Sequence, residues 1–138
     1  MFKIEMLEHT ADLKYRVEAD TFEELLQGSL KSVIESMTEI EEGRLIDVKK
    51  NVCFDAVDEL FHDFIRQGLR FVYIDNLLPI AWEDKGSLFG ERIEGDYLLL
   101  DMSKRKIIFF SEVKAITYQE FKLTKAGDRY LVEFVLDV

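Results

Sequence analysis

Apolar and polar residues alternate in several short stretches of the chain, and two longer stretches have a helical repeat. In the segments 2–7 and 13–17 every second residue is apolar, as in half-buried strands. From Phe22 to Met37 the apolar residues recur about every 3.6 positions, and only the small Ser29 interrupts them. This pattern predicts two strands followed by a helix over 22–37.

Residues beside these stretches carry helix start signals. Thr21 and Glu24 have the Thr-x-x-Glu spacing of a capping box, in which two backbone N–H groups at a helix start find partners. A second helix is predicted to open at Asp55, a residue suited to the N-cap. Its apolar stripe consists of Val57, Leu60, Phe61, Phe64, Ile65, Gly68, Leu69 and Val72. Each predicted helix therefore has one apolar face.

The remaining segments favour strands. A strand is predicted in "RLIDVKKNVCF", with Cys53 in the core, and further strands in "LPIAWE", "YLLLDM", "KIIFF", "VKAITYQEFKL" and "RYLVEFVLDV". In the last of these, alternation places Asp137 on the face opposite to the apolar one. Strands at both ends and helices between them predict an α+β sandwich, in which two amphipathic helices cover a mostly antiparallel or mixed sheet.

Length and charge limit the number of domains and the classes of binding partner. The 138 residues suffice for one domain, expected over 1–138, and the single Pro and seven Gly leave no tract that resembles a linker. A formal net charge of −10 disfavours direct binding to nucleic acid or anionic lipid, so we expect RNA contact only through a partner. One cysteine makes no intramolecular disulfide, and we find neither a secretory signal nor a run that could span a membrane. We expect a cytoplasmic protein.

The candidate chemistry is concentrated in "EHTAD", between the first two predicted strands. Asp12 and Asp137 are candidate ligands for a hard cation, because Ca²⁺ and Mg²⁺ prefer carboxylate and carbonyl oxygens. The terminal carboxylate of Val138 could be a further ligand. The alternative for Asp12 is a turn or cap aspartate that bonds backbone N–H groups nearby.

The other polar residues of this stretch have supporting roles in this interpretation. We expect His9 to orient Asp12 rather than to bind the metal, and Thr10 to add a local hydrogen bond. Glu8 is either an outer acidic group of the site or a solvated strand end.

Other residues that invite a functional interpretation have simpler explanations. His62, Asp58 and Asp63 lie off the apolar stripe of the second helix, so a solvated helix face explains them better than a metal site. The two glycines of "LFGERIEGD" lack the spacing of a phosphate-binding loop. No Ser or Cys stands beside a histidine in a recognised motif, so we expect no catalytic residue and no small-molecule substrate.

Three segments together resemble the archease family: "EHTAD", the predicted helix "TFEELLQGSLKSVIESMTE", and "EVKAITYQEFKL" followed by a chain end in "VLDV". The resemblance implies a non-enzymatic factor that promotes guanylylation and multiple turnover of an RtcB-type RNA ligase in tRNA splicing or RNA repair. It also implies a metal site built from Asp12 and the C-terminal end of the chain. We expect Ca²⁺ there, before Mg²⁺ or another divalent ion.

The resemblance also implies a functional role for Lys114, which either steadies the acidic site or reaches toward the ligase. From the residues alone, a lysine on an apolar strand is equally explained as one that extends to water. We expect Tyr118 to serve packing. Gln119 stands where family members often have histidine, so no imidazole role is expected there.

Two other classes of function remain open from the sequence. A metal-dependent hydrolase could use the carboxylates of Asp12 and Asp137 to activate water. A general chaperone-like module would instead expose a broad apolar patch.

Overall fold

A computed structural model of the chain describes residues 1–7, 12–41, 43–55 and 58–138. The chain contains two α-helices, one short 3₁₀-helix and eight strands within these residues. In order, the elements are β1 (Phe2–Leu7), β2 (Leu13–Ala19), α1 (Phe22–Glu35), β3 (Val48–Phe54), α2 (Leu60–Tyr73), β4 (Leu77–Asp84), β5 (Ile93–Asp101), η1 (Met102–Lys104), β6 (Ala115–Ile116), β7 (Lys122–Ala126) and β8 (Arg129–Asp137).

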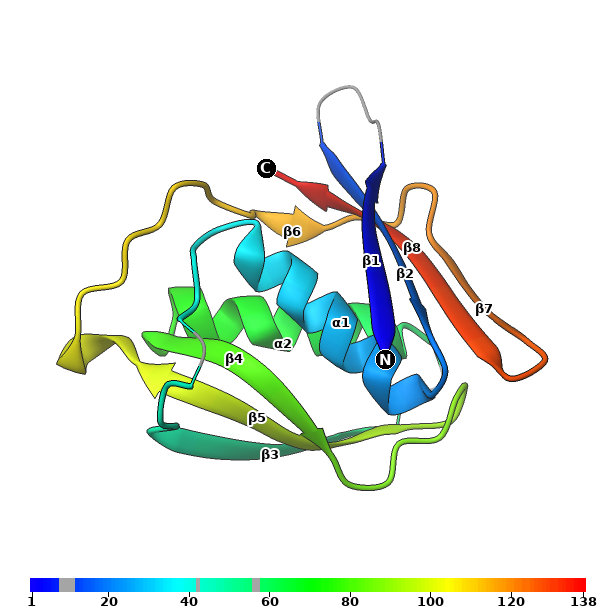
Figure 1. Ribbon diagram of the computed structural model, residues 1–138, viewed down its shortest axis with the longest axis horizontal. Coiled ribbons are helices and arrows are strands. Elements are labelled where there is room, and N and C mark those ends of the chain that lie inside the picture. Colours follow the sequence, from blue (N-terminus) through cyan, green and yellow to red (C-terminus); the bar gives the residue numbers. More distant parts are fainter. Residues whose placement is uncertain (8–11, 42, 56–57) are drawn as a thin grey trace.

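The strands form two sheets, and the helices lie between them (Figure 1). The first sheet has the order β1-β2-β8-β6, with β7 also paired with β8, and the second has the order β3-β5-β4. All pairings between the described strands are antiparallel. The predicted α+β class with antiparallel pairing is therefore confirmed, with the strands divided between two sheets.

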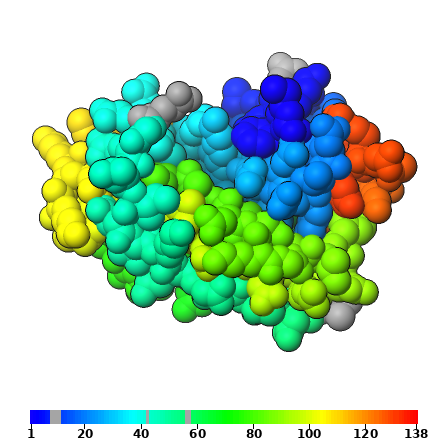
Figure 2. Space-filling view, turned by 60° about the horizontal axis from the view of Figure 1, so that its bottom comes forward, coloured from blue at the N-terminus to red at the C-terminus, as the bar shows by residue number. Residues whose placement is uncertain are grey.

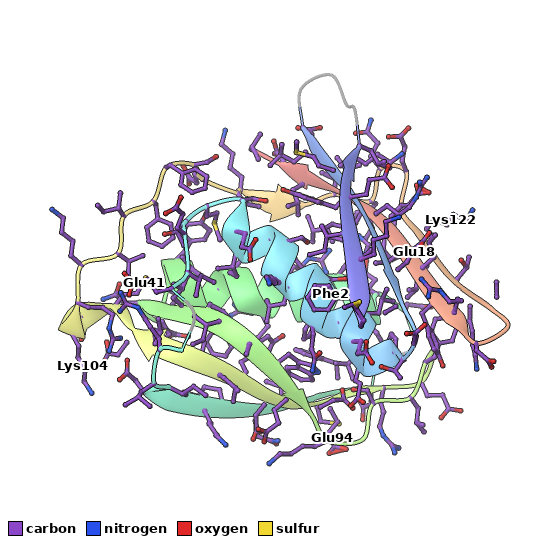
Figure 3. All side chains as sticks on the ribbon, viewed as in Figure 1. Phe2, Glu18, Glu41, Glu94, Lys104 and Lys122 are labelled. Atoms are coloured by element: carbon purple, nitrogen blue, oxygen red, sulfur yellow. The ribbon has the colours of Figure 1, made fainter. Side chains whose placement is uncertain are left out.

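One hydrophobic cluster joins both sheets and both helices. In β8, Val132, Phe134 and Leu136 are buried in this cluster, as the alternation predicted. Helix α1 packs against β1, β2 and β8 on one side and against β4 on the other, and α2 contacts β4, β5 and β6. Both faces of the helical layer are covered by strands. Small residues of α1 therefore make room for strands that pack close to the helix. A Cβ at Gly28 would lie 2.8 Å from the ring of Phe2, so this glycine lets β1 approach the helix (Figure 3).

The first helix follows the sequence pattern closely. Thr21 caps it, and its hydroxyl accepts a hydrogen bond from the backbone N–H of Glu24 at 3.1 Å. The Ser29 hydroxyl donates to the carbonyl of Leu25 at 2.7 Å, so this polar residue is satisfied inside the apolar stripe. The helix ends at Glu35, two residues before the predicted end.

The second helix begins later than predicted. It opens at Leu60 rather than Asp55, because Glu59 has a left-handed backbone conformation (φ 72°) that a helix cannot contain. Residues 56–57, which include one position of the predicted stripe, lie outside the described residues. The prediction of a helix start at Asp55 was wrong, whereas the apolar face from Leu60 to Val72 is confirmed.

Two predicted strands of the C-terminal half differ in the structure. The "KIIFF" segment (106–110) forms no strand and makes a single antiparallel bridge, between Phe109 and Thr38. The "VKAITYQEFKL" segment is divided into β6 and β7, because the chain turns at residues 118–120 and Glu120 has a positive φ of 53°. The second break follows from this local departure from extended backbone.

The environments predicted for Cys53 and His62 were both wrong. Cys53 is exposed, because β3 is an edge strand and alternation turns Cys53 away from the core that Val52 and Phe54 contact. His62 is only 2% exposed, because the chain after β6 covers this side of α2. Asp58 is exposed as expected, and Asp63 is half-buried.

Candidate functional site

The antiparallel pairing of β2 with β8 brings together residues from opposite ends of the sequence. Leu13 and Leu136 form the last pair of the register at this end. Asp12 directly precedes Leu13 and Asp137 directly follows Leu136, so both aspartates lie at this end of the β2–β8 pair. The fold thus places the two predicted carboxylates at the same end of the sheet, and both residues are half-buried.

A third strand meets Asp137 from the other side. Ala115 of β6 is registered with Asp137, and the N–H of Lys114 donates to the carbonyl oxygen of Asp137 at 2.7 Å. Lys114 is exposed, and Val138 has 37% of its surface exposed. Four of the predicted site residues, Asp12, Lys114, Asp137 and Val138, therefore lie at one end of the five-stranded sheet. In Figure 1 the C-terminus lies at this end, next to β6.

This arrangement suits a cation by charge and by donor type. Like charges at opposed positions of neighbouring strands destabilise a sheet, and a divalent ion bound by both carboxylates would remove that repulsion. Carboxylate oxygens, with the terminal carboxylate of Val138, are the donors that Ca²⁺ and Mg²⁺ take. Within residues 1–7, 12–41, 43–55 and 58–138, no group of three His, Cys, Asp or Glu residues could hold a metal. The candidate ligands at this end of the sheet remain those predicted from the sequence, Asp12, Asp137 and Val138.

Three predicted members of the site, Glu8, His9 and Thr10, lie outside the described residues. Their predicted roles stay predictions. The backbone N–H of Gln119, the residue that departs from the family pattern, donates to the hydroxyl of Thr117 at 3.1 Å within the turn after β6.

A polar cluster around His62 was missed by the sequence interpretation. The Nε2 atom of His62 lies 2.8 Å from the carbonyl oxygen of Thr117, and its ring stacks on Tyr118 with centroids 4.6 Å apart. The Tyr118 hydroxyl donates to the carboxylate of Glu59 and accepts from the guanidinium of Arg66. Tyr118 thus packs as predicted, but it also joins the turn after β6 to the start of α2. No local sequence pattern indicates this connection, because its partners lie far apart in the sequence.

Burial is the main cause of the shifted pKa of His62. It lowers the pKa of the imidazole below its ordinary value, and the hydrogen bond to Thr117 opposes this shift only in part. With its hydrogen on Nε2, the ring donates to the carbonyl oxygen of Thr117 in either protonation state, so it is burial that favours the neutral form. His62 is therefore a buried neutral residue that fixes the turn leading from Lys114 toward β7.

A second ion pair orders the chain after β5. The Arg105 guanidinium binds the carboxylate of Asp47 and donates to the carbonyl of Asp101 at 2.9 Å. The hydrogen bond from Arg105, followed by one from the backbone N–H of Asp101, lowers the pKa of Asp47 to about 2. This pair holds the loop before β3 against the chain that follows β5.

Comparison with known proteins places the chain in a family. The model described as the archease protein family (MTH1598/TM1083) matches residues 4–138. The chain belongs to the archease family. Among curated archeases, that of Methanopyrus kandleri is 29% identical, with 97% of this chain and 98% of the relative covered. That of Pyrococcus abyssi is 29% identical with both chains covered completely.

Two solved structures share the fold. The solution structure of Methanobacterium thermoautotrophicum protein 1598 has a TM-score of 0.73 at 18% identity and covers 99% of this chain and 98% of its own. The crystal structure of an archease from Thermotoga maritima, described as a possible chaperone, has a TM-score of 0.60 at 25% identity and covers 97% and 96%. The α+β arrangement of this chain is thus an archease fold. In the part of the chain described by the structure, no helix is long and apolar enough to cross a membrane.

Proposed function

We propose that this archease is a non-enzymatic accessory factor of an RtcB-type RNA ligase. It promotes guanylylation and multiple turnover of the ligase in tRNA splicing or RNA repair, in the cytoplasm. The observation that supports the proposal most is the pairing of β2 with β8, because it brings Asp12 and Asp137, the two acidic residues singled out from the sequence, to the same end of the sheet.

Under this proposal Asp12, Asp137 and the terminal carboxylate of Val138 hold a divalent ion, with Ca²⁺ as the expected species. When bound, the ion supplies positive charge that neutralises the carboxylates and attracts oxygen groups of a partner. The residues of the chain do the positioning. The Lys114 N–H fixes Asp137 through its carbonyl, and the exposed Lys114 side chain is available to a partner.

The charge of the molecule favours a protein partner over RNA. A net charge of −10 repels phosphate backbones, so RNA is reached only through the ligase. We propose neither a small-molecule substrate nor a membrane contact. Lys114 is then a partner-contacting residue, and Glu8, His9 and Thr10 keep the supporting roles expected from the sequence.

The test is ligase guanylylation and RNA joining by the host's RtcB-type enzyme, with wild-type archease and with the variants Asp12→Ala and Asp137→Ala. Each variant is expected to lose at least about tenfold of the stimulated turnover, because residues around metal sites contribute effects of this size. Asp128→Ala is the matched control, since Asp128 is an exposed aspartate in the turn between β7 and β8. Calorimetric titration with Ca²⁺ and Mg²⁺ gives a second measurement that does not depend on the ligase.

Unchanged stimulation by both well-folded aspartate variants would contradict the role of the acidic site. Hydrolysis of a phosphoester by the isolated protein with Mg²⁺, Mn²⁺ or Ca²⁺ would favour a metal-dependent hydrolase instead.

A chaperone-like role is the second candidate, and exposed apolar side chains favour it. Ile108 and Phe110 are 70% and 63% exposed, and the Thermotoga maritima relative is described as a possible chaperone. Protection of unrelated proteins from aggregation, unaffected by Asp12→Ala, would support this role over the first.

A further inference from the structure

The segment Lys106–Ser111, which we call the strap, crosses the molecule between η1 and β6 without regular structure. It is nevertheless fixed along its length. Arg105 anchors its start through Asp47, and the Thr38 hydroxyl donates to the carbonyl of Ile108 at 2.6 Å. Just beyond its end, the Tyr73 hydroxyl donates to the carbonyl of Val113 at 2.7 Å. The strap is therefore a positioned surface rather than a loose loop.

The strap exposes several large apolar side chains. Ile108 and Phe110 are among the most exposed large apolar residues of the described chain, and Phe109 is 39% exposed. Neighbouring Tyr73, at the end of α2, is 48% exposed. Contiguous apolar side chains in water are a feature of protein interaction sites, because covering them removes that surface from water.

The backbone of the strap also has an unpaired edge. Phe109 is bridged to Thr38, and the Phe110 N–H donates to the carbonyl of Met37 at 2.9 Å. In this antiparallel pattern Phe109 is the non-hydrogen-bonded member, so its own N–H and C=O point away from Thr38. They make no hydrogen bond to any residue that the structure describes. An extended peptide could pair with this edge, as in strand addition.

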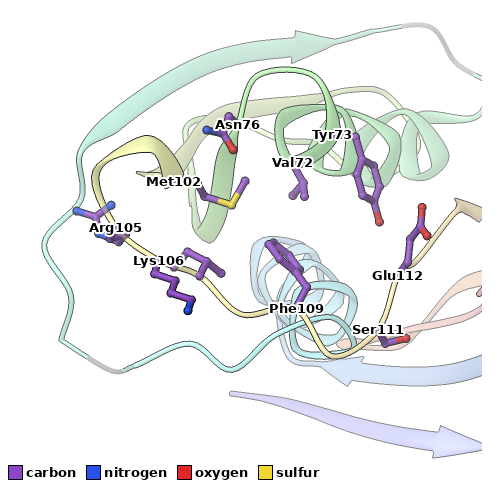
Figure 4. Close-up of a pocket in the computed structure, with 10 residues that line it drawn as sticks. Val72, Tyr73, Asn76, Met102, Arg105, Lys106, Phe109, Ser111 and Glu112 are labelled. Carbon is purple, nitrogen blue, oxygen red and sulfur yellow. The ribbon is translucent and has the colours of Figure 1, made fainter.

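A cavity of about 460 Å³ adjoins the strap on the side of α2 (Figure 4). Its apolar lining comes from Val72 and Tyr73 of α2, from Met102 of η1 and from Phe109, which points into the space in the close-up. Glu112 lines the end of the cavity next to Tyr73. The cavity could receive an apolar side chain from a segment paired with the strap.

The surface on the α1 side of the strap is acidic. Helix α1 has no basic residue in its last turn, so the partial negative charge of its C-terminus is not compensated there. Phe110 lines a hollow together with Glu35 and Glu39. Glu35 pairs with Lys31 at 3.7 Å, an exposed pair of little strength. Glu39 forms no ion pair with any described residue, so this rim attracts a basic side chain.

Beyond Glu39, the same end of the molecule carries charges of both signs. Glu41 and Arg44, which form an ion pair at 3.3 Å, line a neighbouring hollow together with Lys106, Ile108 and Phe110. In Figure 2 the yellow surface near residues 100–110 lies beside the cyan surface near residue 40. Figure 3 shows Glu41 and Lys104 at this end as well. Positive charge at the start of the strap and negative charge beside α1 would give a bound segment a direction.

We propose that the strap is the docking surface for an extended, apolar and basic segment of the protein partner that uses the acidic site. This inference rests on the proposed function. The two places lie within reach of one partner, because Lys114, which donates a hydrogen bond to Asp137, is only four positions after Phe110 in the chain. Four extended residues span at most about 14 Å. Docking on the strap brings the partner to the carboxylate pair.

The test measures the affinity of the host's RtcB-type ligase for wild-type archease and for the double variant Ile108→Ser/Phe110→Ser. We expect the dissociation constant to rise at least about tenfold, as for truncation of aromatic anchors in interfaces. Leu88→Ser is the matched control, since Leu88 is 45% exposed in the loop between β4 and β5. Circular dichroism and thermal unfolding confirm that each variant is folded.

Hydrogen exchange tests the same inference in the wild-type protein, without any substitution. Binding of the ligase is expected to slow exchange of the Phe109 amide in the wild-type protein, because that amide gains a partner. An unchanged rate in a saturated complex would overturn the inference, as would equal affinity of the double variant.

The inference and the proposed function fail in different ways. If wild-type archease neither binds nor stimulates the ligase, the proposed function fails and the inference with it. If it binds and stimulates, and the double variant does both equally well, only the strap inference fails. A dimer in light scattering that the double variant abolishes would show that a second copy covers the strap, and would also overturn the inference.

Discussion

At the residue scale, His62 shows how tertiary packing sets the chemistry of a side chain. The ring lies between Tyr118 and Phe121, with centroid distances of 4.6 and 4.5 Å. Burial lowers the pKa of the imidazole, although Glu59 and Asp63 nearby favour its charged form. Arg66 disfavours that form. The neutral ring is thus the form that the folded protein accommodates.

The protein is expected to lose stability as the pH falls below about 6.5, the ordinary pKa of histidine. Above this pH the imidazole is neutral in both states. Below it the unfolded chain takes up a proton first, so the free energy of unfolding falls until the pH passes the lower folded-state pKa. Urea unfolding at pH 7.5 and pH 5.5 measures this change.

The variant His62→Gln is the comparison for this measurement, because an amide can still donate to the carbonyl of Thr117 without titrating. The difference between the two pH values should be smaller in the variant than in the wild-type protein. Equal pH dependence in both proteins would show that His62 does not contribute.

At the element scale, the hairpin of β4 and β5 depends on a close approach at Gly95. A Cβ at this position would lie 2.4 Å from the backbone carbonyl oxygen of Glu83 and 2.7 Å from the Trp82 ring. Backbone cannot yield as a flexible side chain can. The glycine therefore allows β5 to pack beneath Trp82, which is 2% exposed.

Gly95→Ala is expected to lower the free energy of unfolding by about 2 kcal/mol or more, because overpacking against backbone forces the strands apart. Gly68→Ala is the control. Its added Cβ would meet only the end of the Leu30 side chain, at 3.1 Å, and alanine is the better helix former. Chemical denaturation of both variants should show a large loss for the first and a small change for the second. Equal losses would contradict the explanation.

At the scale of the whole molecule, the candidate acidic site and the strap are close neighbours along the chain. The carboxylate pair belongs to the five-stranded sheet, and the strap leads from the three-stranded sheet to β6. The net charge of −10 adds a long-range attraction toward a basic partner surface. Under the two proposals, a docking surface and the acidic site are combined in one small protein.

The association rate constant with the ligase is expected to fall about tenfold between 50 and 500 mM salt, because screening weakens charge steering over distances beyond the Debye length. The dissociation rate should change much less. Stopped-flow or surface-based kinetics at several salt concentrations measures both. An association rate that is independent of salt would contradict attraction between an acidic archease and a basic partner face.

Local pattern was enough to predict much of the secondary structure. The helix from Phe22 ends within two residues of its predicted end, because capping by Thr21 and a 3.6-residue stripe are both properties of neighbouring residues. The alternation in β8 likewise placed Phe134 in the core. The types of the residues Asp12 and Asp137 were enough to make them candidates, since carboxylates are hard-cation donors wherever they occur.

Contacts between distant segments determined the rest. The sequence by itself specified which residues form most of each apolar face, but pairing of β2 with β8 decided that Asp12 and Asp137 lie at the same end of the sheet. The same kind of contact buried His62 beneath Tyr118 and left Cys53 exposed at a sheet edge. Periodicity records the preferences of neighbouring residues, whereas strand order and coverage depend on interactions across the chain. Tertiary structure therefore decided where the candidate site lies and which apolar residues remain exposed beside it.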